Sequence, residues 1–218
     1  ECLVGSEMCI RDSYGTMRRH HEFWTSDNTD ACERVFMQWG IGHLFPAITM
    51  AAHVTASPNH QTKRVTPLKF RFDVAMSGRL GFELQPCDMT KEEVEFSKRA
   101  LAEYKRIRPV VQFGDLYRLS SPYESRVASL MYVHEKRAVV FAWLMDKWLA
   151  DSPPPLRLKG LNPAARYLVR EINLDENGPL ANVHERVLGG DFLMDFGIRI
   201  NWKNAFQSVC MEVTETGS

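Results

Sequence analysis

The hydrophobic and polar positions follow two patterns along the chain, and the change between them falls near residue 122. Before it, short β-prone runs alternate with segments of helical period, as in mixed α/β folds. The clearest helix is predicted at 90–107, because Thr90 and Glu93 form a capping box and Pro109 is expected to end the helix. Its predicted buried stripe consists of Val94, Leu101, Tyr104 and Ile107.

A short strand that passes into a helix is predicted near the beginning of the chain. Residues 22–26 are aromatic and β-prone, and the turn-forming residues 27–30 then supply N-cap chemistry. Helical spacing continues over 31–39, and a second apolar run follows at 44–54. Further on, basic residues alternate with apolar ones, which predicts the solvated face of a helix; they are Lys63, Arg64, Lys69 and Arg71.

After residue 122 the helical period disappears and short β-branched and aromatic runs follow one another. A hairpin is predicted from 127–133 to 138–144, and the further short strands are predicted at 156–158, 166–172, 195–200 and 208–213. This spacing is typical of an antiparallel β-sandwich. The pattern therefore divides the chain into an α/β part at 14–122 and a β-sandwich domain at 123–218.

The first residues do not match the rest of the chain. Residues 1–13 lack the apolar core of a secretory signal, and the run at 7–12 resembles the translation of a sequencing-library adapter; the alternative is an ordinary N-terminal tail. We therefore expect them to be foreign to the gene, and we expect the chain to begin inside a protein. A complete (β/α)₈ barrel needs about 250 residues, far more than the α/β part at 14–122 contains. Either this domain is of a smaller kind, or the chain is a fragment of a barrel protein.

The composition excludes several function classes. The chain has 218 residues, with 27 Lys and Arg against 27 Asp and Glu, so its formal net charge is zero. This balance argues against electrostatic binding to nucleic acid or to an anionic membrane surface. No apolar run reaches the roughly 20 residues that a membrane span needs. Five cysteines without a CxxC pair argue against a disulfide framework or a zinc ribbon and favour a reducing, cytoplasmic compartment.

The candidate chemistry is concentrated in the run Trp-Thr-Ser-Asp-Asn-Thr-Asp at 24–30. Barrel enzymes place catalytic groups where a parallel strand ends and the chain passes into a helix. Asp27 is the candidate carboxyl there, and Trp24 offers an apolar plate for the carbon-rich face of a sugar ring. The same run also fits a plain helix N-cap, so both interpretations stay open.

Ordered motifs over residues 22–122 resemble the α-galactosidases of glycoside hydrolase family 36. In chain order they are WTSDNTD at 24–30, ER at 33–34, QWG at 38–40, FP at 45–46, MAAHV at 50–54, PNHQT at 58–62, TPL at 66–68, VAMSG at 74–78, LGFEL at 80–84 and QFGDLYR at 112–118. After residue 122 the resemblance is limited to RLKGL at 157–161 and GDF at 190–192.

The resemblance implies the C-terminal portion of a (β/α)₈ TIM barrel followed by an antiparallel β-sandwich domain. It also implies retaining hydrolysis of terminal α-linked galactose in oligosaccharides such as melibiose and raffinose, by two carboxyl groups roughly 5 Å apart. Asp27 fits the family's acid/base, and Trp24 fits a sugar-contacting aromatic residue. Asp30 fits either a carboxylate that supports the site without touching the sugar or one that caps the helix. Neither a metal nor an organic cofactor is implied, and the full-length enzyme is a possible homo-oligomer.

The chain also departs from the family pattern. The family's nucleophile lies upstream, in a strand motif with Lys, Trp and Asp, and this sequence contains no such motif; the expected glycine-rich loop before the acid/base strand is also missing. We therefore expect the isolated chain to be inactive. Alternatives that stay open are an α-N-acetylgalactosaminidase or a galactosyl transferase of the same fold, and a non-catalytic carbohydrate-binding fragment.

Overall fold

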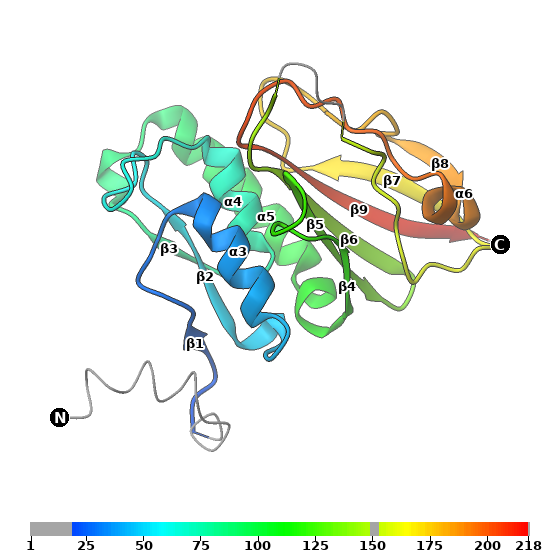
Figure 1. The fold of residues 1–218 in the computed structure, drawn as a ribbon, viewed down its shortest axis with the longest axis horizontal. Helices are drawn as coiled ribbons and strands as arrows, with labels where there is room; N and C mark the ends of the chain where they lie inside the picture. Colours follow the sequence, from blue (N-terminus) through cyan, green and yellow to red (C-terminus); the bar gives the residue numbers. More distant parts are fainter. Residues whose placement is uncertain (1–18, 149–152, 218) are drawn as a thin grey trace.

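In the computed structural model, which describes residues 19–148 and 153–217, a parallel and an antiparallel sheet share a layer of helices (Figure 1). The predicted foreign segment 1–13 lies outside the described residues. In chain order the elements are β1 (Phe23–Trp24), α3 (Ala31–Ile41), the 3₁₀ turn η1 (Ala47–Thr49), β2 (Met50–Thr55), α4 (Leu68–Met76), β3 (Arg79–Glu83), η2 (Pro86–Asp88), α5 (Lys91–Phe113), β4 (Asp115–Ser120), β5 (Val127–His134), β6 (Arg137–Leu144), β7 (Arg166–Ile172), β8 (Arg186–Gly189), α6 (Gly190–Asp195) and β9 (Gln207–Gly217).

The parallel sheet has the order β1-β2-β3 and is built from successive βα units. Phe23 pairs with Met50, and Ala51 pairs with Arg79, so the three strands run in one direction. Their carboxyl ends therefore lie along one edge of the sheet. Repeated βα units with a shared carboxyl edge are the building blocks of a (β/α)₈ barrel.

Helix α5 begins where the sequence predicts and extends further than predicted. Thr90 and Glu93 form the capping box, but the helix continues through Pro109 to Phe113. The prediction that Pro109 ends the helix is therefore wrong. Proline in a helix interior costs about 3 kcal/mol, and the fully buried side chains of Val110 and Val111 in the next turn offset that cost by packing into the core.

Helix α4 is buried on nearly every side, because it lies between β2 of the parallel sheet and β9 of the antiparallel sheet. Lys69 and Arg71 are only 6% exposed, so the predicted solvated basic face is wrong for these two residues. Each has an internal partner: Lys69 pairs with Asp73, and Arg71 donates to the carbonyl oxygen of Thr55. Lys69 and Arg71 alternate with apolar residues because both kinds of side chain lie on a helix that is surrounded by protein.

The antiparallel sheet has the order β4-β5-β6-β9-β7-β8. The predicted hairpin forms as β5 and β6, and the strand predicted at 166–172 coincides with β7. The strand predicted at 195–200 is wrong, since α6 ends at Asp195 and only isolated bridges follow, at Ile198 and Ile200. The predicted strand at 156–158 is likewise reduced to one bridge, at Leu156.

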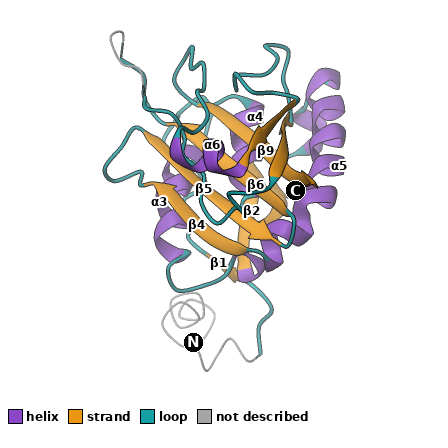
Figure 2. Ribbon diagram, turned by 90° about the vertical axis from the view of Figure 1, so that its right-hand side faces the viewer, coloured by secondary structure: helices purple, strands orange, loops and turns teal. Residues whose placement is uncertain are grey.

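Both faces of the antiparallel sheet are buried, as the alternation along β6 shows. Val139, Phe141 and Trp143 pack into the core shared with the helices of the α/β part. Val140 and Leu144 point to the opposite face, where α6 and the long connections between strands cover the sheet (Figure 2). Residues two apart on a strand share a face, so one strand supplies both cores.

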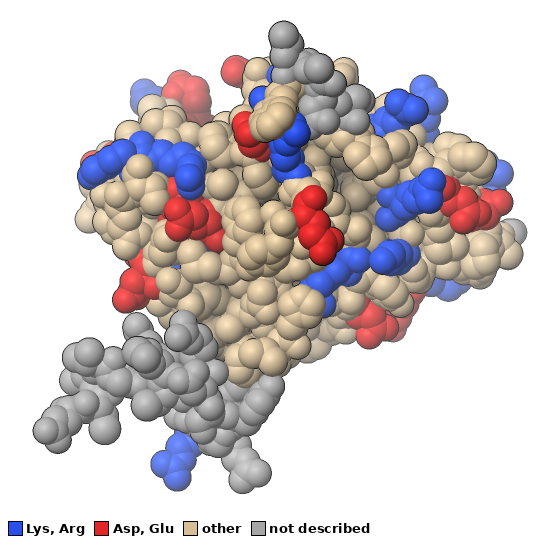
Figure 3. Space-filling model, viewed as in Figure 1, with Lys and Arg blue, Asp and Glu red and all other residues tan. Residues whose placement is uncertain are grey.

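The surface carries charges of both signs. On the face in Figure 3, basic and acidic side chains are interspersed over both parts of the molecule. No helix in the described part of the chain combines the length and the apolar character needed to cross a bilayer.

Candidate active site

The candidate site lies at the carboxyl edge of the parallel sheet, where β1, β2 and β3 end at Trp24, Thr55 and Glu83. The loop that follows β1 carries Asp27, and the loop that follows β2 carries Gln61. In barrel enzymes this edge is the catalytic face. The strand ends therefore bring residues from three separate segments of the chain to one place.

Asp27 lies at the most exposed point of the first loop. Its backbone carbonyl oxygen accepts a hydrogen bond of 3.1 Å from Nε2 of Gln61. Among the described residues, no donor forms a hydrogen bond with its carboxylate, and the residue is exposed. The loop is therefore fixed through its backbone, and the carboxyl group remains available to a ligand.

The helix N-cap is a different carboxylate, that of Asp30. Its Oδ1 accepts hydrogen bonds from the backbone N–H groups of Cys32 at 2.8 Å and Glu33 at 3.1 Å. Arg64 and Thr62 also donate to this carboxylate. Although burial raises it, these hydrogen bonds hold the pKa of Asp30 below its ordinary value. The capping role expected for Asp30 is confirmed, and Asp27 takes no part in it.

Arg34 lies beneath the loop and is 2% exposed. Its Nε donates to the carbonyl oxygen of Asn28 at 2.7 Å, and its two terminal nitrogens donate to Oγ1 of Thr25 at 2.5 Å and the carbonyl oxygen of Ser26 at 2.6 Å. Burial lowers the pKa of Arg34 to about 10, although the nearby charges of Glu83 and Asp27 raise it. The guanidinium therefore stays charged at neutral pH.

Trp24 and His53 form the floor of the site. Their ring centroids are 4.3 Å apart, and the guanidinium carbon of Arg34 lies 4.1 Å from the Trp24 ring centroid. His53 fits because its neighbour on β3 is Gly81: a Cβ at Gly81 would lie 2.5 Å from Cδ2 of the imidazole. Burial lowers the pKa of His53, although the charge of Glu83 raises it. The imidazole is therefore neutral at pH 7.

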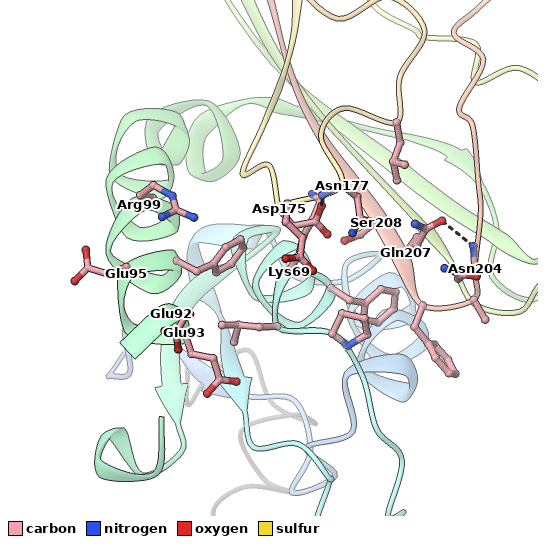
Figure 4. A pocket seen from close by; sticks show the side chains of 18 of the residues that line it. Lys69, Glu92, Glu93, Glu95, Arg99, Asp175, Asn177, Asn204, Gln207 and Ser208 are labelled. Carbon is pink, nitrogen blue, oxygen red and sulfur yellow. Dashed lines mark hydrogen bonds between the residues drawn. The ribbon is translucent and has the colours of Figure 1, made fainter. Parts of the chain in front are cut away.

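A cavity elsewhere in the molecule is lined by neither Asp27 nor Trp24. It measures about 690 Å³ and lies between α4 and α5 on one side and the antiparallel part on the other. Figure 4 shows Lys69, Asp175 and Ser208 near its centre, with Arg99 on the α5 side. We assign the site from the strand ends, since a barrel positions its reactive groups there.

Metal ligation has no support in the described residues. No group of three His, Cys, Asp or Glu side chains within the described ranges is placed to hold an ion. The buried Cys32 lies near the site, and burial raises the pKa of its thiol to about 11. A thiol that stays protonated at neutral pH is a poor nucleophile and a poor metal ligand.

Comparison with known proteins agrees with this arrangement. The Melibiase family model matches residues 4–114, and the model of the glycosyl hydrolase family 36 C-terminal domain matches residues 127–213. Alpha-galactosidase AgaA of Geobacillus stearothermophilus is 39% identical over 185 residues, which cover 84% of this chain and 24% of AgaA. The chain thus spans about a quarter of the length of this relative.

Solved structures show the same fold. The alpha-galactosidase of Lactobacillus brevis is 32% identical and superimposes with a TM-score of 0.80, covering 94% of this chain and 27% of that one. A variant of AgaA crystallised in complex with raffinose is 36% identical, with a TM-score of 0.79 over 89% of this chain and 26% of that chain.

The two family models and the similar solved structures place this chain, with its parallel βα units and its antiparallel domain, among the glycoside hydrolases. Within this class, the chain belongs to glycoside hydrolase family 36. The resemblance read from the motifs at 24–118 is confirmed, and so is the fold class, a barrel portion followed by an antiparallel β-domain.

Sequence reasoning singled out Trp24 and Asp27, and the structure places both at the carboxyl edge of the parallel sheet. It missed Arg34, Gln61 and Glu83. Glu83 follows the same rule as Asp27, a carboxylate at the end of a strand before a helix, but the strand at Arg79–Glu83 was not predicted, so the rule could not be applied to it. Arg34 and Gln61 lie within the motifs ER at 33–34 and PNHQT at 58–62, but their role could not be predicted, since their contacts depend on how the loops fold back.

Proposed function

We propose that this chain contributes the acid/base part of the active site of a retaining α-galactosidase. The substrate is a terminal α-linked galactose on an oligosaccharide such as melibiose or raffinose. Asp27 acts as the acid/base and Trp24 contacts the sugar. The raffinose complex of the related AgaA variant supports this substrate class.

The observation that carries the proposal is the division of work between two carboxylates in one short loop. Asp30 serves the helix, with several donors on its oxygens, whereas the carboxylate of Asp27 is exposed at the catalytic edge. A general acid needs free access to the leaving oxygen and a fixed backbone. Asp27 meets both requirements.

The chemistry takes two steps. In the first, a nucleophilic carboxylate forms a bond to the anomeric carbon while the bond to the leaving oxygen breaks, and Asp27 gives its proton to that oxygen. In the second, Asp27 takes a proton from water as the water oxygen bonds to the anomeric carbon and the carboxylate leaves. The released galactose keeps the α configuration.

The test is Asp27→Asn in the gene product that carries this sequence, expressed in full. General acid catalysis contributes about 100- to 10,000-fold, so kcat/KM for raffinose should fall by that factor. An activated aryl α-galactoside has a leaving group that needs little protonation, so its kcat/KM should fall much less. Asp195→Asn is the matched control, because Asp195 is an exposed carboxylate at the end of α6, in the antiparallel part.

Azide identifies the role of Asp27 directly. In Asp27→Asn, azide needs no proton removed, so it attacks the anomeric carbon of the galactosyl-enzyme in place of water and yields α-galactosyl azide. Equal losses on both substrates with no azide product would contradict the assignment. Parallel assays with an N-acetylgalactosaminide and with sugar acceptors separate hydrolysis of galactosides from the two related activities.

A further inference from the structure

We infer that Arg34 and Gln61 clamp the loop that carries Asp27 from two sides and act as positioning residues for it. The inference rests on the proposed function, since it assigns these residues to the acid/base group. Neither residue is placed to react: Arg34 is buried beneath the loop, and the side-chain amide of Gln61 forms its hydrogen bonds with the backbone of Asp27 and Thr29.

The first side of the clamp is the guanidinium of Arg34. Its three hydrogen bonds run back along the chain, to residues nine, eight and six positions earlier: Thr25, Ser26 and Asn28. These acceptors bracket Asp27 in sequence. Because guanidinium presents its donors in one rigid plane, it fixes the acceptors relative to one another, which a lysine ammonium cannot do.

The helix itself does not need these bonds. Asp30 already caps α3, so the donors of Arg34 satisfy the loop and not the helix end. The carboxylates of Glu83 and Asp27 act on Arg34 through their charge and form no hydrogen bond with it. Arg34 therefore combines a mechanical hold on the loop with a positive charge beneath the candidate site.

The second side of the clamp comes from the neighbouring βα unit. The side-chain amide of Gln61 donates to the carbonyl oxygen of Asp27 at 3.1 Å and accepts from the N–H of Thr29 at 3.2 Å. Gln61 is held in turn by the buried Asn59, whose Oδ1 accepts its backbone N–H at 2.9 Å. Asn59 also donates to Oγ1 of Thr29 at 3.0 Å.

The two sides together fix the backbone on both flanks of Asp27 while the carboxylate stays free. A misplacement of about 1 Å at a catalytic group can cost about 100-fold in rate. Loss of the clamp should therefore act on proton transfer to the leaving oxygen more than on sugar binding. The rate should therefore fall more for substrates whose leaving group needs protonation than for activated ones.

The experiment compares Arg34→Lys and Gln61→Glu in the full gene product. Lysine keeps the charge and loses the planar fork, whereas glutamate keeps an acceptor for Thr29 and loses the donor to Asp27. We expect kcat/KM for raffinose to fall about 10- to 100-fold in Arg34→Lys and about 3- to 10-fold in Gln61→Glu. For the activated aryl galactoside, the fold-decrease in kcat/KM should be less than a third of the decrease seen with raffinose.

A second readout does not depend on catalysis. Hydrogen exchange of the backbone amides in the loop at 25–29 should accelerate in both variants. The matched control is Arg71→Lys, because Arg71 is also a buried arginine on a helix, α4. Its partners are the carbonyl oxygen of Thr55 and the carboxylate of Glu93, and it forms no hydrogen bond with the loop at 25–29. Arg71→Lys should leave unchanged the ratio of kcat/KM for raffinose to kcat/KM for the aryl galactoside. It should also leave unchanged the hydrogen exchange of the backbone amides at 25–29.

The outcomes separate the two proposals. Asp27→Asn is expected to lower kcat/KM more for raffinose than for the aryl galactoside. If it does so, but neither clamp variant does and hydrogen exchange of the loop is unchanged, the clamp is overturned and the proposed function stands. If Asp27→Asn does not lower kcat/KM more for raffinose, the proposed function fails first. If Arg34→Lys does not fold, Gln61→Glu decides the matter, since Gln61 is exposed.

Discussion

Arg34 and Lys69 are both buried cations on helices of the same α/β part, yet they are used in different ways. Arg34 directs its donors to neutral oxygens of a loop. Lys69 forms an ion pair of 2.8 Å with Asp73, whose carboxylate also accepts from Asn173 and Ser208 at 2.6 Å each. One cation lies at the carboxyl edge of the parallel sheet, and the other lies where the two sheets meet.

The difference separates a structural charge from a functional one. Burial lowers the pKa of Lys69, but the charge and hydrogen bond of Asp73 raise it by more, so the net shift is upward. The ammonium therefore stays protonated, and the carboxylate of Asp73 balances its charge. No carboxylate forms a hydrogen bond with Arg34, and its positive charge interacts with the negative charges of Glu83 and Asp27 without direct contact. A buried cation that lacks a bonded counter-ion is costly, and a catalytic site is where such a cost is justified by function.

Removing the counter-ion at the junction should have the largest effect on stability. In Asp73→Ala, Lys69 remains buried without a partner, and Asn173 and Ser208 lose their acceptor. Breaking a buried pair costs about 3–5 kcal/mol, so the free energy of unfolding should fall by that amount in denaturant titrations. A loss below about 1 kcal/mol would mean that the cluster does not hold the two sheets together.

The double variant Lys69→Met with Asp73→Leu is the control for this prediction. Replacing both members of a buried pair by apolar residues is often neutral or stabilising. We therefore expect it to recover most of the stability lost in Asp73→Ala. The comparable replacement of Arg34 by Met should not be rescued by any single partner, because its acceptors are oxygens of the loop.

A smaller, pH-dependent effect is expected at Asp30. Asparagine keeps a capping oxygen but loses the charged contact with Arg64, so Asp30→Asn should cost about 1–2 kcal/mol at pH 7. The folded state lowers the pKa of Asp30, so its contribution is present above the ordinary carboxyl value of 3.8 and is lost as the pH falls through the lower, folded value. Unfolding measured at pH 7 and at successively lower pH should show the difference between wild type and variant shrinking.

The smallest effect is expected at an exposed cation. Lys98 pairs with Glu95 one turn earlier on α5, and both side chains are more than 60% exposed. Exposed pairs of this kind contribute about 0.2–0.5 kcal/mol. Lys98→Ala should therefore leave the unfolding midpoint nearly unchanged. A large loss here would remove the contrast between buried and exposed cations.

Local chemistry predicted the elements whose signals lie within one segment. The capping box of α5, the β5–β6 hairpin and the 166–172 strand all formed where expected. Elements that depend on distant neighbours were predicted less well. Pro109 stays inside a helix because the helix packs into a shared core, and Lys69 is buried because β9 covers α4.

The site shows the same division. Trp24 and Asp27 could be selected because a strand end followed by a helix is visible in the sequence. Arg34 could not be selected, since its role arises only when the loop at 25–28 folds back over the helix. The same holds for Gln61, which reaches Asp27 from the neighbouring loop 34 positions away.

The place of β9 in the antiparallel sheet constrains the order in which the chain can fold during synthesis. β9 is near the carboxyl end of the chain, yet it lies between β6 and β7 and pairs with both (Figure 1). As the chain leaves the ribosome, the β5–β6 hairpin must wait with an open edge until residues 207–217 emerge. A nascent-chain experiment should therefore find β7 and β8 unable to join the sheet before the final strand arrives.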